Sequence, residues 1–301
     1  MQFDAHCIDC LIHRQFRLAM AYGDGRKADA YLRDVMQIML DAPKGVSAPW
    51  LAGAFTTAFE KYWPGEDAYG QLKRQSNDLV LGLLPRIRPI VEQAQDPLEM
   101  ALKFACTGNF LDFGILTPET AHKELHRAIE QTPELPLNPP VWAQLKQQLQ
   151  SASRVLILGD NAGEIVFDML LVEQLQRLYP GLEVTYCVRG ANVLNDATRA
   201  DAAYTGMDSL CRVIDSGAAI SGTELAYIGQ ELKQAMAHAD VILSKGSGNF
   251  ESLAGCGLNV YYVFMCKCMR VAKLLDTRNM TGQLLAEREL AIADPYVGSL
   301  D

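Results

Sequence analysis

The chain has 301 residues, of which 49% are hydrophobic, and it carries a net charge of -9 with a sequence pI near 5.1. This length and apolar content support a substantial core, divided over one or two domains. No cluster of five or more basic residues appears, so the composition argues against nucleic acid and anionic membranes as partners.

The first residues lack both a basic segment and an apolar segment, and no apolar run approaches the ~18 residues of a membrane span. We therefore expect a soluble cytoplasmic protein with no membrane partner. The eight cysteines are scattered through a chain of ordinary size, which favours reduced thiols over a disulfide framework. The sequence carries no signature of an oligomeric state.

The first part of the chain has a helical pattern. Apolar residues recur at spacings of three and four, and Gly or Pro lies near most of the breaks. The predicted helices cover residues 3–22, 26–41, 48–63, 68–90 and 97–104. Four prolines between 131 and 141 cannot continue a helix and predict a linker. We expect a helical domain over 1–135 and a second domain over 141–301.

The second part alternates between strand and helix patterns. Short apolar runs predict strands at 155–158, 183–188, 210–215, 241–244 and 259–264. Helices are expected at 142–151, just before the first strand, and then at 164–179, 196–206, 223–238 and 249–255. Such alternation predicts an α/β fold, a doubly wound and mainly parallel sheet covered by helices, with right-handed crossovers.

Polar side chains follow the first predicted strand at the turn where it ends. Asp160, Asn161 and Glu164 lie between that strand and the next helix. Ligands of open α/β sheets bind outside the carboxyl ends of the strands, so this turn is placed at a site. Two carboxylates and an amide offer oxygen ligands, which suit a hard divalent cation better than a phosphate.

Two further strand ends collect polar residues at the same expected edge of the sheet. The second cluster contains Arg189 and Asp196, and the third contains Lys245 and Asn249. Asp196 would add a carboxylate to the oxygen ligands of the first turn. Lys245 stands in a Gly-rich turn and would supply positive charge to a phosphate. A cation facing a phosphate-binding lysine predicts phosphate ester hydrolysis, with the metal polarising a phosphoryl oxygen or activating water.

Each of these residues also has a simpler interpretation. Asp160 and Asn161 could form an ordinary turn or cap, Asp196 could cap a helix, and Glu164 could favour a helix amino terminus. Lys245 could be a solvated loop lysine, and Arg189 could form a surface ion pair of little energetic value. The coincidence of all three clusters at predicted strand ends favours the functional interpretation.

Three motifs together resemble one family. The runs Gly-Asp-Asn-Ala-Gly-Glu at 159–164, Asn-Asp-Ala-Thr at 195–198 and Ser-Lys-Gly-Ser-Gly-Asn at 244–249 are similar to those of the metal-dependent damage-control phosphatases, long known as a domain of unknown function. The Cys-x-x-Cys pair at 7–10 and the run at 108–114 resemble the microbial subfamily that carries this pair. The resemblance thus covers nearly the whole chain.

The resemblance implies a helical domain joined to a Rossmann-like α/β/α domain. It implies phosphatase activity on small phosphorylated metabolites, including sugar phosphates and damaged or surplus ones. It also implies one divalent cation, with Mn²⁺, Mg²⁺, Co²⁺ and Ni²⁺ all open. The expected metal ligands are Asp160, Asn161 and Asp196, the expected catalytic residues are Asp160, Glu164 and Lys245, and the expected substrate-binding residues are Asn109, Asp112, Arg189 and Asn249.

Competing functions leave other signatures. Position 162 is Ala, so the Asp-x-Asp pair of haloacid-dehalogenase phosphatases is absent. Attack by metal-activated water is therefore a simpler proposal than a covalent phospho-enzyme intermediate. The Gly-x-Gly-x-x-Gly turn of a cofactor-dependent transferase is also absent. A non-catalytic protein that binds a nucleotide or a sugar phosphate at the same strand ends remains the alternative.

Cys7 and Cys10 share one face of the first predicted helix, bracketed by His6 and His13. These side chains could form a second, soft-metal site, completed by a cysteine from the end of the last predicted strand. The simpler interpretation is a pair of small thiols that pack the helix against the second domain.

Overall fold

A computed structural model describes residues 1–109 and 118–291 of the chain. It contains one six-stranded sheet of order β3-β2-β1-β4-β5-β6, in which only β6 runs antiparallel to its neighbour. The strands are β1 Arg154–Leu158, β2 Glu183–Val188, β3 Arg212–Asp215, β4 Val241–Lys245, β5 Val260–Cys266 and β6 Thr281–Ala286. The prediction of a doubly wound, mainly parallel α/β fold is confirmed.

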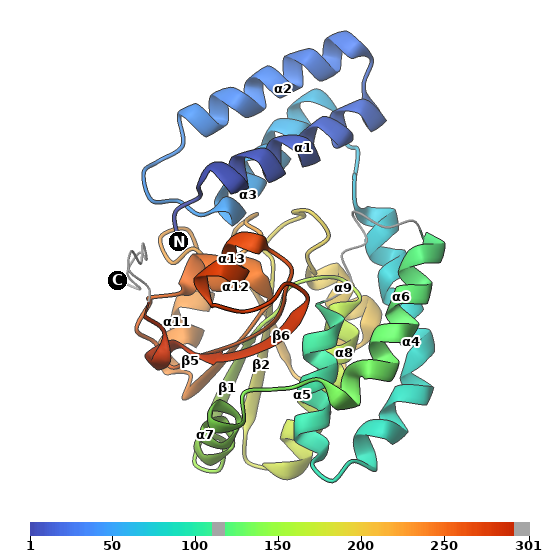
Figure 1. Cartoon of the computed structure of the whole chain (residues 1–301), viewed down its shortest axis with the longest axis vertical. Helices are drawn as coiled ribbons and strands as arrows, with labels where there is room; N and C mark the ends of the chain where they lie inside the picture. Colours follow the sequence, from blue (N-terminus) through green and yellow to red (C-terminus); the bar gives the residue numbers. More distant parts are fainter. Residues whose placement is uncertain (110–117, 292–301) are drawn as a thin grey trace.

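Within residues 1–109 and 118–149, the first half of the chain supplies helices and no strand, as predicted (Figure 1). They are α1 Ala5–Tyr22, α2 Gly25–Leu40, α3 Ala48–Tyr62, α4 Gly70–Glu92, α5 Pro97–Gly108, α6 Pro118–Gln131 and α7 Pro139–Leu149, with a 3-10 turn η1 at Thr132–Glu134. The proline-rich segment is therefore only partly a linker. Helix α7 already begins at Pro139, because proline is tolerated in the first helical turn and the Asn138 side chain caps Val141 N.

The second half differs from the predicted pattern at several places. The remaining helices are α8 Glu164–Leu178, α9 Arg199–Thr205, α10 Met207–Leu210, α11 Gln230–His238, α12 Gly246–Leu253 and α13 Met269–Leu274, and a second 3-10 turn η2 covers Glu287–Glu289. The strand predicted from 210 begins at Arg212, because α10 occupies the preceding residues. The helix predicted from 223 begins at Gln230, and the antiparallel strand β6 was not predicted. Helix α13 was not predicted either, and α12 begins at Gly246, ahead of its predicted start at 249.

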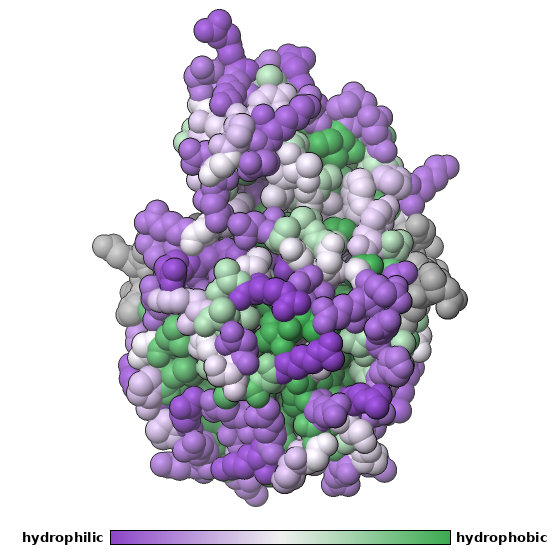
Figure 2. Space-filling model, turned by 180° about the vertical axis from the view of Figure 1, so that it is seen from behind, coloured by the Kyte–Doolittle hydropathy of each residue, from purple (hydrophilic) through white to green (hydrophobic). Residues whose placement is uncertain are grey.

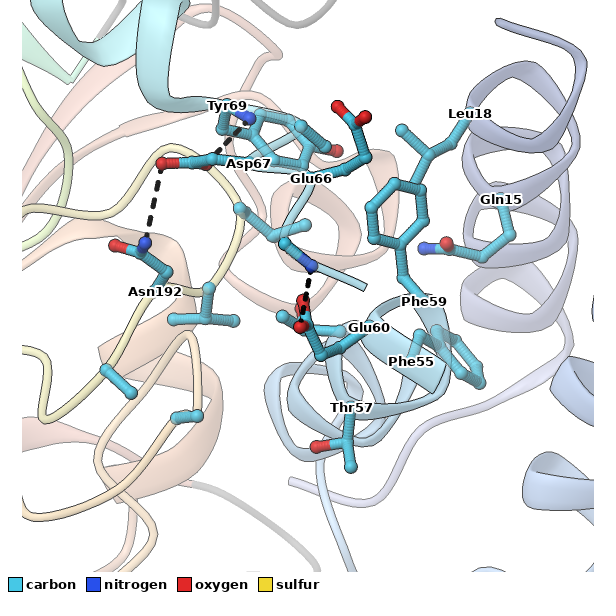
Figure 3. Close-up of a pocket in the computed structure, with 17 residues that line it drawn as sticks. Gln15, Leu18, Phe55, Thr57, Phe59, Glu60, Glu66, Asp67, Tyr69 and Asn192 are labelled. Atoms are coloured by element: carbon cyan, nitrogen blue, oxygen red, sulfur yellow. Dashed lines mark hydrogen bonds between the residues drawn. The ribbon is translucent and has the colours of Figure 1, made fainter. Parts of the chain in front are cut away.

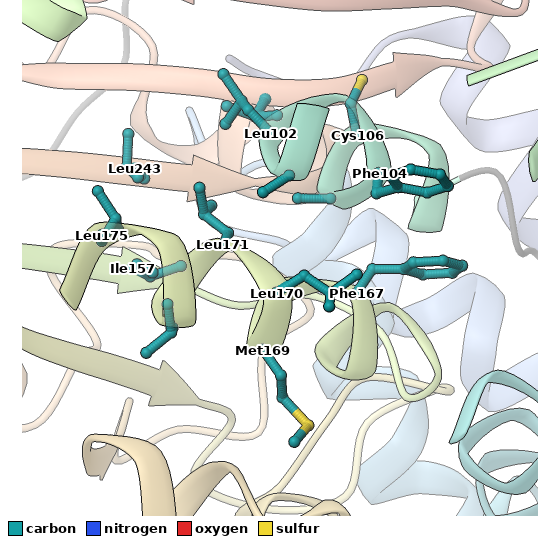
Figure 4. Packing of buried hydrophobic residues seen from close by; sticks show 14 of the residues in the cluster. Leu102, Phe104, Cys106, Ile157, Phe167, Met169, Leu170, Leu171, Leu175 and Leu243 are labelled. Carbon is teal, nitrogen blue, oxygen red and sulfur yellow. The ribbon is translucent and has the colours of Figure 1, made fainter. Parts of the chain in front are cut away.

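The sheet separates two apolar cores, and the side chains of β1 alternate between them. Val155 and Ile157 pack with α4, α5, α7 and α8 on one face, while Leu156 and Leu158 pack with α11, α12 and α13 on the other. Figure 4 shows the first face, where Phe104 of α5 and Phe167 of α8 stack with ring centroids 6.1 Å apart. Helix α8 is buried between the sheet and α5, so its sequence reads as nearly continuous apolar residues.

Helices α1, α2 and α3 form a separate unit with its own core, centred on Tyr31, Phe55 and Trp63. Figure 1 shows this three-helix unit beside the edge of the sheet at which the parallel strands end. Helices α4 and α5, in contrast, share the core of the sheet. A domain boundary near residues 135–141 stays a prediction. Residues on both sides of this boundary contribute to the core of the sheet.

On the face shown in Figure 2, most of the surface is polar, with apolar patches between the polar side chains. Among the helices that the structure describes, none combines the length and apolar character that a membrane crossing requires.

Candidate active site

The site lies where the strand order reverses, between the carboxyl ends of β1 and β4. Leu158 pairs with Ser244 at that point, and each strand then leads through a turn into a helix. The two turns approach so closely that a Cβ atom on Gly246 would lie 2.1 Å from Asp160 Oδ2. Gly246 also has φ +79°, a conformation that favours glycine. This is the crevice in which doubly wound sheets bind their ligands.

Backbone hydrogen bonds join the loop after β1 to the loop after β2. Ala197 N donates to Asp160 O at 2.7 Å, and Ala162 N donates to Asn195 O at 2.9 Å. Asn161 and Asp196 form an isolated antiparallel bridge between the same loops. Asp196, which is distant in sequence, is thereby brought beside Asp160 and Asn161, the other two residues predicted as metal ligands.

Asp160 is buried and accepts hydrogen bonds on both carboxylate oxygens. Its Oδ2 accepts from Asn109 Nδ2 at 3.0 Å and from Asn161 Nδ2 at 2.7 Å, and its Oδ1 accepts from Arg189 at 3.2 Å. Burial, together with the nearby charges of Asp196 and Glu164, raises the pKa of Asp160 well above its usual range. The cationic side chains near Asp160 thus do not fully offset the negative charge of its ionised form.

Arg189 spans the two carboxylates predicted as metal ligands. Its Nε donates to Asp196 Oδ2 at 2.6 Å, while its terminal nitrogens donate to Asp160, Asn249 and Gly222 O. Asp196 also accepts from Ser221 at 2.9 Å. Burial raises the pKa of Asp196, although the Arg189 guanidinium and the Ser221 hydroxyl act in the opposite direction. Arg189 is therefore a buried partner of these carboxylates, not a surface residue.

Lys245 is fully buried and uses its ammonium group on three protein oxygens. Nζ donates to Glu164 Oε1 at 2.7 Å, to Asp168 Oδ1 at 2.6 Å and to Ala105 O at 2.9 Å. An ammonium has three N–H donors, so this set accounts for all of them. Burial raises the pKa of Asp168 to about 6 despite the adjacent Lys245. In this structure Lys245 contacts carboxylates, and its predicted contact with a phosphate stays a prediction.

Two asparagines fix the relative positions of these groups. Asn109, just after α5, donates to both Asp160 and Glu164, and its own Oδ1 accepts from Met265 N. Asn249 of α12 donates to Lys245 O and Gly159 O, which ties the two turns together. Both residues were predicted to bind substrate, and both are buried inside the network. Asp112 lies outside the described residues.

Three residues of the network escaped the sequence analysis. Asp168 lies one helical turn after Glu164 in the otherwise apolar helix α8, and that spacing could have marked it. Tyr186 of β2 donates to Asp168 Oδ2 at 2.7 Å. Nothing in the sequence marks it as a site residue, because tyrosine is common in strands. Lys267 follows β5 at the same sheet edge as the other clusters and donates to Asn109 O at 2.6 Å.

The buried side chains of the network carry more negative than positive charge. Asp160, Glu164, Asp168 and Asp196 supply four carboxylates, while Lys245 and Arg189 supply two buried cations and the half-buried Lys267 supplies a third, so the carboxylates still outnumber the cationic side chains. A divalent cation would offset this excess, and the carboxylate and amide oxygens are of the ligand type that such cations prefer. The donor chemistry of the site therefore fits the predicted cation.

No ready-made metal cluster accompanies this charge excess. Within residues 1–109 and 118–291, no three His, Cys, Asp or Glu side chains converge as a metal site. Asp160 and Asp196 are instead bridged by Arg189, so a bound cation would have to share these carboxylates with the guanidinium. The same finding gives no support to a soft-metal site at the Cys-x-x-Cys pair, where Cys7 is buried in the three-helix unit and Cys10 is exposed.

The fold and the site together define a doubly wound α/β protein with a carboxylate-rich crevice at the reversal of strand order. The chain matches the family model of the damage-control phosphatase ARMT1-like domain over residues 3–281. It belongs to this family, which confirms the predicted resemblance and makes the chain a damage-control phosphatase by class.

Individual proteins are similar to this chain over most of its length. A damage-control phosphatase of Archaeoglobus fulgidus is 30% identical over 224 residues, which cover 74% of this chain and 76% of that one. An uncharacterized protein of Methanocaldococcus jannaschii is 28% identical over 278 residues, covering 89% and 90%. The crystal structure of a DUF89 family protein from Pyrococcus horikoshii has the same fold, with a TM-score of 0.83 at 24% identity, over 95% of this chain and 99% of that one.

Proposed function

We propose that this chain hydrolyses phosphate esters of small metabolites, sugar phosphates or related damaged or surplus compounds, with the help of one divalent cation. The observation that carries the proposal is the excess of carboxylates over cationic side chains in the network at the β1–β4 crevice. Family membership favours this function over the alternative of a non-catalytic sugar-phosphate binding protein.

Asp160, Asn161 and Asp196 would hold the cation. When bound, the cation polarises a phosphoryl oxygen and offsets the negative charge that develops on the transferring group. Arg189 would keep Asp160 and Asp196 ionised and in place, because its guanidinium donates to both. Glu164 accepts from Asn109, Asn161 and Lys245, so it is held beside Asp160 in one orientation.

We assign the two lysines different roles. Lys245 acts as a positioning residue, since its three donors hold Glu164, Asp168 and the carbonyl of Ala105. Lys267 is half-buried, and its charge is close enough to lower the pKa of Asp160. It is the better candidate for a contact with the substrate phosphate. Substrate contacts of Asn109, Asp112, Arg189 and Asn249 remain part of the proposal, as does a cytoplasmic location.

The test measures phosphate release from sugar phosphates, nucleotides and p-nitrophenyl phosphate by metal-stripped protein, alone and with Mg²⁺, Mn²⁺, Co²⁺ or Ni²⁺. We expect activity only with a cation. Asp160→Asn and Asp196→Asn should each lower the rate by at least about 100-fold, the scale typical of lost transition-state charge stabilisation. Both substitutions keep the side-chain shape, so a folded variant without activity points to the charge.

Asp215→Asn is the matched control. Asp215 ends β3 at the same edge of the sheet but pairs with Arg199 near the surface. Its substitution should leave the rate nearly unchanged. Full activity of the stripped protein, or of either folded Asn variant at the site, would overturn the metal assignment. Metal-dependent binding of phosphorylated compounds without any turnover would instead favour the binding protein.

A further inference from the structure

A second cavity lies outside the catalytic network. It has a volume of about 510 Å³, within the range of metabolite pockets. Its walls come from α1 and α3, from the connector between α3 and α4, and from the loops after β2 and β3 (Figure 3). None of the residues proposed to hold the cation lines it, although residues 191–194, which do, belong to the same loop as Arg189 and Asp196. The cavity lies between the three-helix unit and the α/β core.

The mouth of this cavity is acidic. Glu60, Glu66 and Asp67 line it, and none of the three forms an ion pair with any residue that the structure describes. Their hydrogen bonds are few: Glu60 accepts from Gly65 N, and Asp67 accepts from Tyr69 N and from Asn192. Three uncompensated carboxylates at one opening attract a cation.

The inner wall is apolar and aromatic. Leu18, Phe55 and Phe59 line it, and the two phenylalanines belong to the buried core of the three-helix unit. A hydrated metal ion gains nothing from such a wall, whereas an alkyl or methylated ammonium group packs against it and interacts favourably with ring faces. The cation that fits is therefore organic.

A buried amide points into the same cavity. Gln15 is only 2% exposed, and its Oε1 accepts from Tyr31 OH at 2.6 Å. This orients Nε2 toward the cavity, as Figure 3 shows, and Nε2 has no partner among the described residues. Nε2 is not fully enclosed, so it keeps contact with the cavity and can donate to an acceptor such as a hydroxyl or carbonyl oxygen of a ligand.

We propose that this cavity binds an amino alcohol, a small organic ammonium ion that also carries a hydroxyl group. The ammonium would lie near Glu66 and Asp67, the carbon atoms would pack on Leu18 and Phe59, and the hydroxyl would accept from Gln15 Nε2. The class of ligand follows because acidic side chains, an apolar wall and the Gln15 amide meet in one cavity.

The test is calorimetric titration of the full chain with choline, and with two analogues that each lack one feature. 3,3-Dimethylbutan-1-ol has the shape and hydroxyl of choline without its charge, and tetramethylammonium has the charge without the hydroxyl. We expect choline to bind more tightly than either. Because heat of binding is measured without a phosphate ester, the outcome is independent of whether the phosphatase proposal holds.

Two sets of variants locate the binding. Glu66→Gln with Asp67→Asn removes two charges but keeps the acceptor for Tyr69 N, and should weaken choline binding about tenfold. Glu130→Gln, an exposed glutamate of α6 outside the cavity, is the control and should leave binding unchanged. Gln15→Met should bring the affinity for choline down to that for tetramethylammonium.

Absence of saturable choline binding would overturn the proposal. If the neutral alcohol bound as tightly as choline, the proposed role of the ammonium group would be wrong. If tetramethylammonium bound to the unmodified protein as tightly as choline, the proposed role of the hydroxyl group would be wrong. An equal loss of affinity in the Glu130→Gln control would show a general charge effect and contradict the assignment to this cavity.

Discussion

Lys245 illustrates how the structure changes the role of a single residue. Its place in a Gly-rich turn after a strand predicts a phosphate-binding lysine, but its side chain runs inward and meets Glu164 and Asp168 without exposure to solvent. Coulombic attraction from these carboxylates raises its pKa against the opposing effect of burial. The lysine and the two carboxylates therefore have to be treated as one charged unit.

Removing the lysine should be costly. We predict that Lys245→Met lowers the free energy of unfolding by about 3–5 kcal/mol, because it leaves two buried carboxylates without their counter-ion. It should also abolish phosphatase activity, since Glu164 loses its support. Urea or thermal denaturation of the metal-free variant measures the first effect.

Lys61→Met serves as the comparison. Lys61 pairs with Asp34 on the surface, with a side chain 74% exposed, and such pairs contribute at most about 1 kcal/mol. A loss for Lys245→Met as small as that for Lys61→Met would show that the two carboxylates do not need Lys245 as a counter-ion, and would contradict the treatment of the three residues as one charged unit.

At the level of elements, the site depends on two turns that lead from strand to helix. The turn after β1 carries the ligand candidates, and the turn after β4 begins α12 at Gly246, directly against Asp160. The sequence indicates a turn at both places. It does not show that the turns touch, because that contact follows from the pairing of β1 with β4.

Because of this contact, we expect any substitution of Gly246 to disturb Asp160. Gly246→Ala places a methyl group against the Asp160 carboxylate and forces Ala into a positive φ. We predict a loss of about 1–3 kcal/mol in unfolding free energy, together with a large loss of phosphatase activity because Asp160 has to move. Chemical denaturation and phosphate release measure the two effects on the same preparation.

A second glycine provides the opposite expectation. Gly82 lies in the exposed interior of α4, and a Cβ there meets nothing within 4 Å. Gly82→Ala should stabilise the protein by about 0.5–1 kcal/mol through helix propensity and leave activity unchanged. If Gly246→Ala behaved like Gly82→Ala, the close approach of the two turns would not exist in solution.

The whole molecule consists of a large two-sided core around the sheet and a smaller core within the three-helix unit. The chain crosses between them through the exposed residues 64–67. A small core with its own helices opens more readily than the central strands do. The cavity proposed for an amino alcohol lies at the junction between these parts.

We predict that amide hydrogen exchange separates the two parts. Amides of α1, α2 and α3 should exchange together, through a local opening of lower free energy than that of β1 and β4. Helix α5, which packs against α8 and the sheet, should be protected like the strands. Equal protection of the three-helix unit and the strands would contradict this and show that the molecule opens only as a whole.

The sequence by itself determined the helical first half, the strand and helix alternation of the second half, and the concentration of polar residues at the strand ends. These features are local, because the period of apolar residues and the residue types after a strand are both visible in a short window. The family resemblance rests on the same local runs and is confirmed.

Only the tertiary structure decided which of these polar residues pair. Arg189 with Asp160 and Asp196, and Lys245 with Glu164 and Asp168, are contacts across the sheet edge. Such pairings depend on strand order and on the direction of each side chain. The amino-acid spacing does not encode either of these. For the same reason the cavity at Gln15, between segments distant in the chain, has no signature in the sequence.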